Sequence, residues 1–236
     1  MKIKKIESMV VFFILQLFLL GNATASTMNI AGEDIKAPYV NDYVLITKES
    51  DAEFYKIFET FTSKNNNLKA AYVQTDEYNL IKKRSSKDIK NYKLVQTLNS
   101  LEKRHVSSKD FLKLKLKVKR DWEVVLEKVK DKIPEITAQI SSAIKKEYDT
   151  KFKFEIDEII PVELFETDSS ITSINIGSVN SSKGKYKMVV ANTITKIKGK
   201  VLVILSYRRL NNIKDIQILK ESAIETRNAF IEANKF

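Results

Sequence analysis

The last third of the chain contains four strand-like runs separated by short turns, and this pattern limits the fold more than any other feature. The runs span residues 152–160, 171–179, 186–196 and 201–207. Turn-forming residues lie between them, with Gly184 and Gly199 at the positions where the chain has to reverse. Connections this short join antiparallel neighbours. We therefore predict an antiparallel sheet in this part of the chain.

An amphipathic helix is expected to follow the last strand. From Asn212 onward, apolar residues recur at helical spacing on one face: Ile216, Leu219, Ala223, Phe230 and Ile231. This spacing predicts a C-terminal helix that lies across one face of the sheet and closes the fold.

The first part of the chain alternates short strands with short helices. Residues 28–37 read as a small hairpin, and residues 43–46, 68–74 and 92–98 as further strands. Asp51 is placed to cap a helix whose apolar face carries Phe54, Ile57, Phe58 and Phe61. Residues 76–83 are expected to form another short helix.

The middle of the chain gives the longest helical signal. Ser107 and Asp110 have capping-box spacing, so a helix should begin at about Ser108. Its apolar stripe comprises Phe111, Leu114, Val118, Trp122, Val125 and Val129. Residues 112–119 also alternate Leu or Val with Lys, as a strand would, but Leu and Lys are good helix formers and the stripe continues beyond them. Pro134 can open a second helix that ends near Tyr148.

These patterns together predict an α+β fold with an antiparallel sheet packed by long amphipathic helices. We expect residues 26–236 to form a single domain, with a helical middle at 108–149 and a four-strand sheet plus helix at 150–236. Hydrophobic residues make up 43% of the chain, which is typical of a globular protein. The chain has only five Gly and three Pro, which argues against long flexible linkers.

Residues 1–25 have the pattern of a cleavable signal peptide. Lys2, Lys4 and Lys5 precede an apolar run at 9–20 that is too short to span a bilayer, for which about 20 residues are needed. Ala23 and Ala25 supply the small residues that signal peptidase requires, so cleavage is expected before Ser26. The mature protein is thus expected to be exported, periplasmic or secreted. We find no later transmembrane segment in the sequence, and the absence of cysteine excludes a lipid-anchored cysteine and disulfides.

The chain is strongly basic, with a formal net charge of +11 at pH 7. This charge favours anionic partners such as a lipid or polysaccharide surface. Nucleic acid is a less favoured partner, because Lys outnumbers Arg 35 to 6 and bidentate phosphate or base recognition prefers Arg. The alternative is that abundant Lys reflects genome composition and forms a solvated surface.

The sequence contains no recognisable catalytic or metal-binding motif. His105 is the single histidine and lies in a polar segment, so we assign no metal site and no cofactor. Ser-x-x-Lys spacing occurs at Ser100, Ser142 and Ser182, about as often as chance predicts for 19 Ser and 35 Lys, and the companion motifs of penicillin-interacting enzymes are absent. Carboxylates cluster at 155–158 and 163–168, where an acid–base pair for glycan hydrolysis is conceivable only if they converge.

The best candidate for a binding face is the basic side of the helix expected from Ser108. An anionic surface could contact seven cations there: Lys109, Lys113, Lys117, Lys119, Arg120, Lys128 and Lys130. Any solvent-exposed helix carries charges too, and Glu123 and Glu127 dilute the second half of this one. Both interpretations remain open at this point.

A succession of short segments resembles a group of uncharacterised exported bacterial proteins. The segments are residues 35–38, 43–44, 71–73, 93–97, 109–111 and 198–202, followed by a helix that closes on 229–234. In outline the chain is also similar to the α+β domain of the PsbP, Mog1 and DcrB type, although Asn41 and Asp42 stand where a glycine is expected after the early proline. The resemblance implies the fold and export, and it transfers no catalytic residue.

By elimination, the sequence favours an exported, non-enzymatic binding or envelope-associated protein. Two alternatives stay open. One is a cationic protein that binds anionic membranes or polyanions through residues 109–130, and the other is a carboxylate-based hydrolase of envelope glycans.

Overall fold

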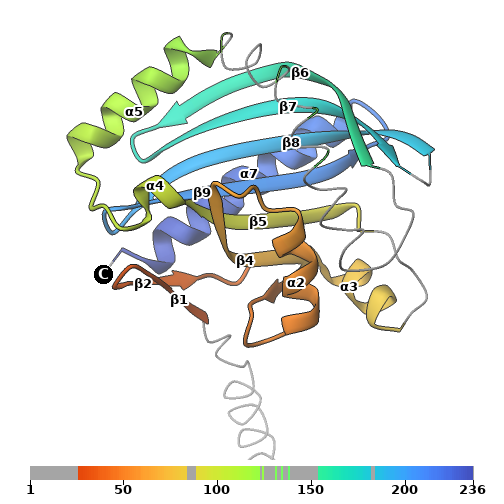
Figure 1. The fold of residues 1–236 in the computed structure, drawn as a ribbon, viewed down its shortest axis with the longest axis horizontal. Helices are drawn as coiled ribbons and strands as arrows, with labels where there is room; N and C mark the ends of the chain where they lie inside the picture. The colour runs from red at the N-terminus through yellow and green to blue at the C-terminus, as the bar shows by residue number, and fades with distance from the viewer. Residues whose placement is uncertain are drawn as a thin grey trace, which may run out of the picture.

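The protein is α+β, with a seven-stranded antiparallel sheet in the order β3-β4-β5-β9-β8-β7-β6. The computed structural model describes residues 26–83, 89–122, 154–181 and 184–235, together with residues 124, 131, 134 and 138. The sheet curves across the molecule, with helices on both of its faces (Figure 1). The predicted antiparallel sheet and closing helix are therefore confirmed. The predicted signal segment lies outside the described residues.

A separate two-stranded hairpin precedes the large sheet. Strands β1 (Ser26–Ile30) and β2 (Glu33–Ala37) are antiparallel, as predicted. The turn places Ala31 and Gly32 at positive φ, the conformation that favours tight hairpin turns. Ile30 and Ile35 are fully buried beneath the sheet, so the hairpin covers part of its core.

The first half of the sheet follows the predicted alternation of strands and helices. Its elements are β3 (Tyr43–Ile46), α2 (Ala52–Thr60), β4 (Asn66–Gln74), α3 (Thr75–Lys82) and β5 (Asn91–Leu98). The Asp51 side chain accepts a hydrogen bond from the Phe54 amide, which confirms the predicted cap. Phe54 and Phe58 are buried against β4 and β5. This half therefore has its own apolar layer under α2.

The second half contains the four long strands. They are β6 (Phe154–Thr167), β7 (Ser170–Ser181), β8 (Gly184–Ile197) and β9 (Lys200–Leu210). β6 extends seven residues beyond the predicted run, so the second acidic cluster begins on a strand and not in a loop. β9 also pairs with β5, and this pairing joins the predicted C-terminal sheet to the first half.

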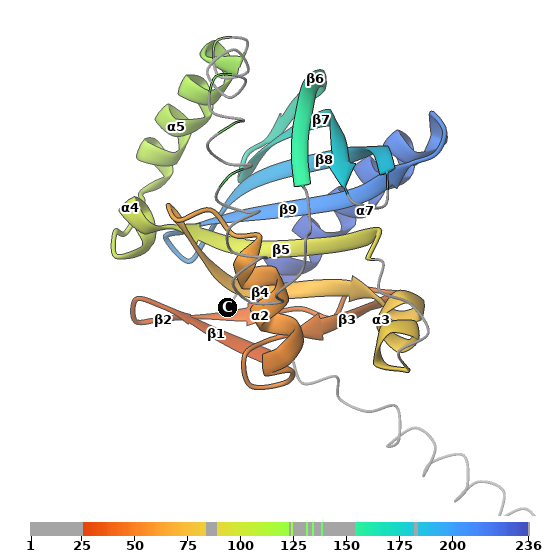
Figure 2. The same cartoon turned by 45° about the vertical axis from the view of Figure 1, so that its right-hand side comes forward.

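The C-terminal helix α7 (Lys214–Ala233) lies behind the sheet in the view of Figure 1. Leu219 and Ala223 pack on β7 and β8, and Phe230 packs near the β1–β2 hairpin. The opposite face is covered by α2 and by the start of α5 (Figure 2). The sheet thus separates α7 on one side from α5 on the other.

Helix α5 (Ser108–Arg120) begins where predicted and follows the short helix α4 (Asn99–Glu102). The Ser107 side chain accepts a hydrogen bond from the Asp110 amide. The expected continuation of the apolar stripe, and most of the expected second helix at 134–148, lie outside the described residues.

Candidate functional site

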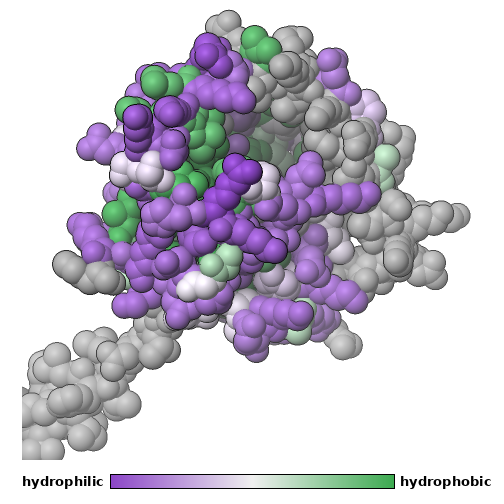
Figure 3. All heavy atoms as spheres, turned by 60° about the vertical axis from the view of Figure 1, so that its left-hand side comes forward, coloured by the Kyte–Doolittle hydropathy of each residue, from purple (hydrophilic) through white to green (hydrophobic). Residues whose placement is uncertain are grey.

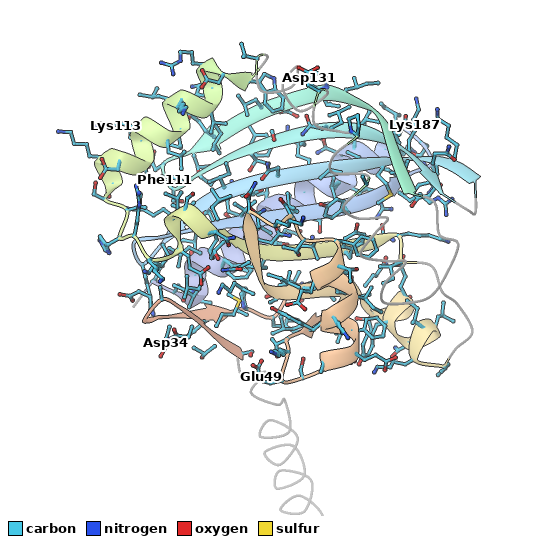
Figure 4. The ribbon with its side chains drawn as sticks, in the orientation of Figure 1. Asp34, Glu49, Phe111, Lys113, Asp131 and Lys187 are labelled. Atoms are coloured by element: carbon cyan, nitrogen blue, oxygen red, sulfur yellow. The ribbon has the colours of Figure 1, made fainter. Side chains whose placement is uncertain are left out.

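The inner face of α5 holds the helix against the sheet with one apolar and one charged anchor. Phe111 is buried beside Val106 and Val201, and Lys115 is also buried. Figure 4 shows Phe111 turned toward the body of the protein and Lys113 turned away from it. Residues 112–119, which alternate Leu or Val with Lys as a strand would, are therefore helical, and one of their lysines, Lys115, is part of the core.

Lys115 and Lys119 attach α5 to the last residues of β6. Lys115 Nζ lies 2.6 Å from the Thr167 carbonyl oxygen and 3.7 Å from Glu166 Oε2. Lys119 Nζ lies 2.7 Å from Glu166 Oε1. Through these contacts the pKa of Glu166 is lowered, first by the hydrogen bond from Lys119. Lys119 belonged to the predicted binding face, but its ammonium already has a carboxylate partner within the protein.

The outer face of α5 combines exposed leucines with exposed cations. Leu112 and Leu116, one helical turn apart, are 52% and 56% exposed. The same outward arc also carries Lys109, Lys113, Lys117 and Arg120. Figure 3, with the α5 side of the molecule turned forward, shows hydrophobic residues exposed among hydrophilic ones. We call Lys109, Leu112, Lys113, Leu116, Lys117 and Arg120 the outer α5 face.

The cations of the outer α5 face form only weak ion pairs with carboxylates of the described residues. Lys113 lies 3.8 Å from the exposed Asp110, and Arg120 lies 3.0 Å from its neighbour Asp121, which is partly exposed. Exposed pairs of this kind contribute about 0–1 kcal/mol. Within the described residues, neither Lys109 nor Lys117 has an ion-pair partner. The predicted cations Lys128 and Lys130 lie outside the described residues.

The structure separates the acidic residues of the second cluster. Glu163 is bonded to Lys220 of α7 at 2.6 Å, whereas Glu166 is bonded to Lys119 of α5. Residues three apart on a strand point to opposite faces of the sheet, so these two carboxylates cannot converge as an acid–base pair. The side chains of Glu155, Asp157 and Glu158 lie outside the described residues.

His105 is exposed and lies against the β8–β9 turn. A Cβ atom on Gly199 would come within 2.2 Å of the His105 ring, and Gly199 has a φ of +74°. The Val106 amide donates to the Gly199 carbonyl at 2.7 Å in the same place. In the part of the chain that the structure describes, no group of three or more His, Cys, Asp or Glu side chains could hold a metal.

One polar cluster was not found from the sequence, and it lies under α7. Lys93 of β5 is fully buried, and its Nζ lies 2.7 Å from Ser222 Oγ of α7. The same ammonium is 4.5 Å from the centroid of the Tyr43 ring. The two hydrogen-bonded residues are 129 positions apart, so no sequence spacing could reveal them. The one available signal was a lysine in the middle of a run that predicts a strand, at 92–98.

Burial changes the acid–base chemistry of Lys93. Loss of solvation lowers the pKa of its amine to about 8, and Glu225 partly opposes this effect. Burial likewise raises the pKa of Tyr43, and an interaction with Ser222 partly opposes that rise. Lys93, Ser222 and Tyr43 therefore form a connected polar group beneath α7.

Comparisons with family models, with curated proteins and with solved structures yield no match, so no relative supplies a function. The resemblance to exported bacterial proteins stays a prediction. Among the described helices, none is long and apolar enough to cross a membrane.

Proposed function

We propose that this protein is exported and binds the surface of anionic phospholipid membranes through the outer α5 face. The observation that carries the proposal is the pair of exposed leucines, Leu112 and Leu116, among cations on one arc of α5. Interfacial helices have this arrangement, with apolar side chains inserted between headgroups and lysines directed at lipid phosphates. The 13 residues of α5 give a contact line about 20 Å long.

The leucines favour lipid over the other anionic partners. A polysaccharide or a nucleic acid backbone would use the cations, but it offers no apolar layer that would take up two aliphatic side chains. A bilayer offers both, because anionic headgroups lie directly above acyl chains. Residues 26–236 keep a net charge of +9, because cleavage removes three Lys and one Glu from a chain of +11, and this charge would bring the protein to such a surface before the helix makes contact.

Liposome co-sedimentation tests the proposal. Each Lys or Arg near an anionic surface contributes about 1 kcal/mol, so neutralising three of them should weaken binding by about 3 kcal/mol, or about 100-fold. The variant is Lys113→Gln, Lys117→Gln and Arg120→Gln in one chain. Vesicles of 30% phosphatidylserine should bind the unaltered protein in a salt-sensitive manner and should retain little of the triple variant.

A matched variant separates a site from overall charge. Lys48, Lys64 and Lys83 are exposed and are not part of α5, so changing all three to Gln removes the same charge. Equal losses in both triple variants would contradict the proposal, because they would show attraction by net charge alone.

A second variant separates lipid from other polyanions. Leu112→Ser with Leu116→Ser keeps every cation of the outer α5 face. We expect this double variant to lose vesicle binding but to keep its retention on heparin. If vesicle binding survives intact, the leucines do not enter the membrane and a purely electrostatic polyanion surface replaces the proposal.

Export is a separate part of the proposal and has its own test. Cleavage before Ser26 predicts that the intact mass of the protein recovered from exporting cells corresponds to residues 26–236. Recovery of a chain that retains residues 1–25 in the cytoplasm would contradict export, whatever the vesicle result.

A further inference from the structure

The polar group beneath α7 is costly for the fold, and no structural need for it is visible in the described residues. Lys93 lies opposite Tyr72 on β4 and opposite Ser206 on β9, in the middle of the sheet. Fully buried lysines are rare unless they are paired. No described carboxylate is within ion-pair distance of Lys93, and the buried Ser206 hydroxyl beside it has no hydrogen-bond partner.

The surroundings of Lys93 determine what its amine can do. The polar groups that face it are the Ser222 hydroxyl on α7, the Tyr43 ring on β3 and the Ser206 hydroxyl on β9, with Glu225 acting from an exposed position. A buried amine with no counterion is driven toward its neutral form. A neutral amine 2.7 Å from a hydroxyl accepts the proton of that hydroxyl, which reverses the direction of the hydrogen bond.

Ser222 differs from Lys93 in its access to solvent. Ser222 is partly exposed on α7, whereas Lys93 is fully buried below it. Ser222 therefore lies between solvent and the buried amine. Serine paired with a desolvated lysine is an established variant of the serine nucleophile and its base.

We propose that Ser222 is a nucleophile for acyl transfer from carboxylic esters and that Lys93 is its general base. Neutral Lys93 takes the Oγ proton as Oγ forms a bond to the ester carbonyl carbon. The bond from that carbon to the leaving alcohol oxygen then breaks, and the lysine ammonium returns the proton to this oxygen. Water from solution hydrolyses the acyl-serine by the same route, so ester and water yield acid and alcohol.

The protein contains its own control for this chemistry. Ser108 Oγ and Lys196 Nζ form a second serine–lysine pair at 2.8 Å, but this pair is exposed to solvent. The two pairs match in distance and differ in burial. If proximity alone activated a serine, both would react, whereas the proposal requires that only Ser222 does.

A fluorophosphonate probe followed by peptide mass spectrometry tests the proposal on the purified protein. We expect covalent labelling at Ser222 and none at Ser108, with a rate that rises between pH 7 and pH 9. Ser222→Ala should abolish the labelling and Ser108→Ala should leave it unchanged. General-base assistance is worth about 100-fold or more, so Lys93→Met should reduce the labelling rate at least that much. Turnover of p-nitrophenyl butyrate should follow the same order.

Two results would overturn the proposal. One is no labelling of Ser222 in the unaltered protein at pH 9, which needs no variant and so does not depend on any variant folding. The other is labelling of Ser222 at an undiminished rate in a folded Lys93→Met protein. Vesicle binding should be unchanged in Ser222→Ala, because α5 and α7 lie on opposite faces of the sheet, so the two proposals fail independently.

Discussion

Lys115, on the inner face of α5, and Lys93, beneath α7, are both buried, and their partners differ. Lys115 of α5 is within 2.6 Å of the Thr167 carbonyl and 3.7 Å of a Glu166 carboxylate oxygen. Lys93 has the Ser222 hydroxyl at 2.7 Å, and no described carboxylate forms an ion pair with it. The first ammonium is paired as a structural anchor would be, and the second is not.

This difference distinguishes a lysine that stabilises the fold from a lysine whose amine is available for acid–base chemistry. A buried cation that has a counterion holds elements together, and removing it leaves its partners unpaired. A buried cation without a counterion destabilises the fold, and its removal should relieve that cost. We therefore expect that replacing Lys93 stabilises the folded protein and that replacing Lys115 destabilises it.

The largest expected change is a gain in stability on replacing Lys93. Because the pKa of Lys93 falls from 10.5 to about 8, its burial costs about 3 kcal/mol at pH 7. Lys93→Met should therefore raise the free energy of unfolding by up to that amount. The penalty is fully present below pH 8, falls as the pH rises, and disappears above pH 10.5, where the amine is neutral in both states. Urea unfolding at pH 7, 9 and 10.5 measures this trend.

The comparison fails if Lys93→Met is destabilised at every pH. That result would show that the aliphatic chain and the hydrogen bond of Lys93 contribute more than desolvation costs. A gap between variant and parent that does not narrow toward pH 10.5 would equally contradict the assignment of the penalty to charge.

Replacing Lys115 should have the opposite sign and a somewhat smaller size. Lys115→Met leaves the Thr167 carbonyl without its donor and Glu166 with Lys119 alone. Loss of one buried partner of this kind costs about 2 kcal/mol. The midpoint of urea unfolding should fall, with Leu112→Met on the exposed side of the same helix as the control. If the two substitutions have equal effects, Lys115 is no anchor.

A carboxylate placed beside Lys93 should make it a buried lysine with a counterion, as Lys115 is. Ser222→Asp gives the ammonium a counterion, while Ser222→Asn is nearly the same size and gives none. Hydrogen bonds to charged groups contribute about 1.5 kcal/mol, so the Asp variant should be more stable than the Asn variant by that amount at pH 7. Identical unfolding curves would show that Lys93 is neutral or out of reach in these variants.

The sequence was sufficient to predict most secondary structure, because the relevant signals are local. Period-two runs and their turns locate β6 to β9, and the Asp51 and Ser107 caps locate the starts of α2 and α5. The outer α5 face was also predictable in part, since its lysines repeat at helical spacing. The predicted apolar stripe left out Leu112 and Leu116, but the predicted binding face included only cations, so these two leucines were not assigned to it.

The sites that depend on tertiary contacts were beyond the sequence. Lys93 meets Ser222 only because β5 becomes a central strand and α7 crosses behind it, and neither residue carries a local mark of the other. Glu163 and Glu166 looked like one cluster, but strand alternation directs them to Lys220 and Lys119 on opposite faces. The sequence therefore predicted the helices and strands, whereas the burial of these side chains and the partners they face follow only from the tertiary structure.

The smallest expected effect concerns the counterion of the paired lysine. The pKa of Glu166 is lowered, mainly by the hydrogen bond from Lys119, so its ionised form stabilises the folded protein. That contribution is present above the ordinary carboxyl pKa near 4.5 and is lost as the pH falls through the lower folded value. Glu166→Gln should therefore be slightly less stable than the parent at pH 7, and the two should converge in acid, once the pH lies below the lowered pKa of Glu166. The effect is small because both partners are partly exposed. If the difference persists in acid, Glu166 acts through packing, and the contrast between Lys115 and Lys93 rests on the Thr167 carbonyl and not on charge.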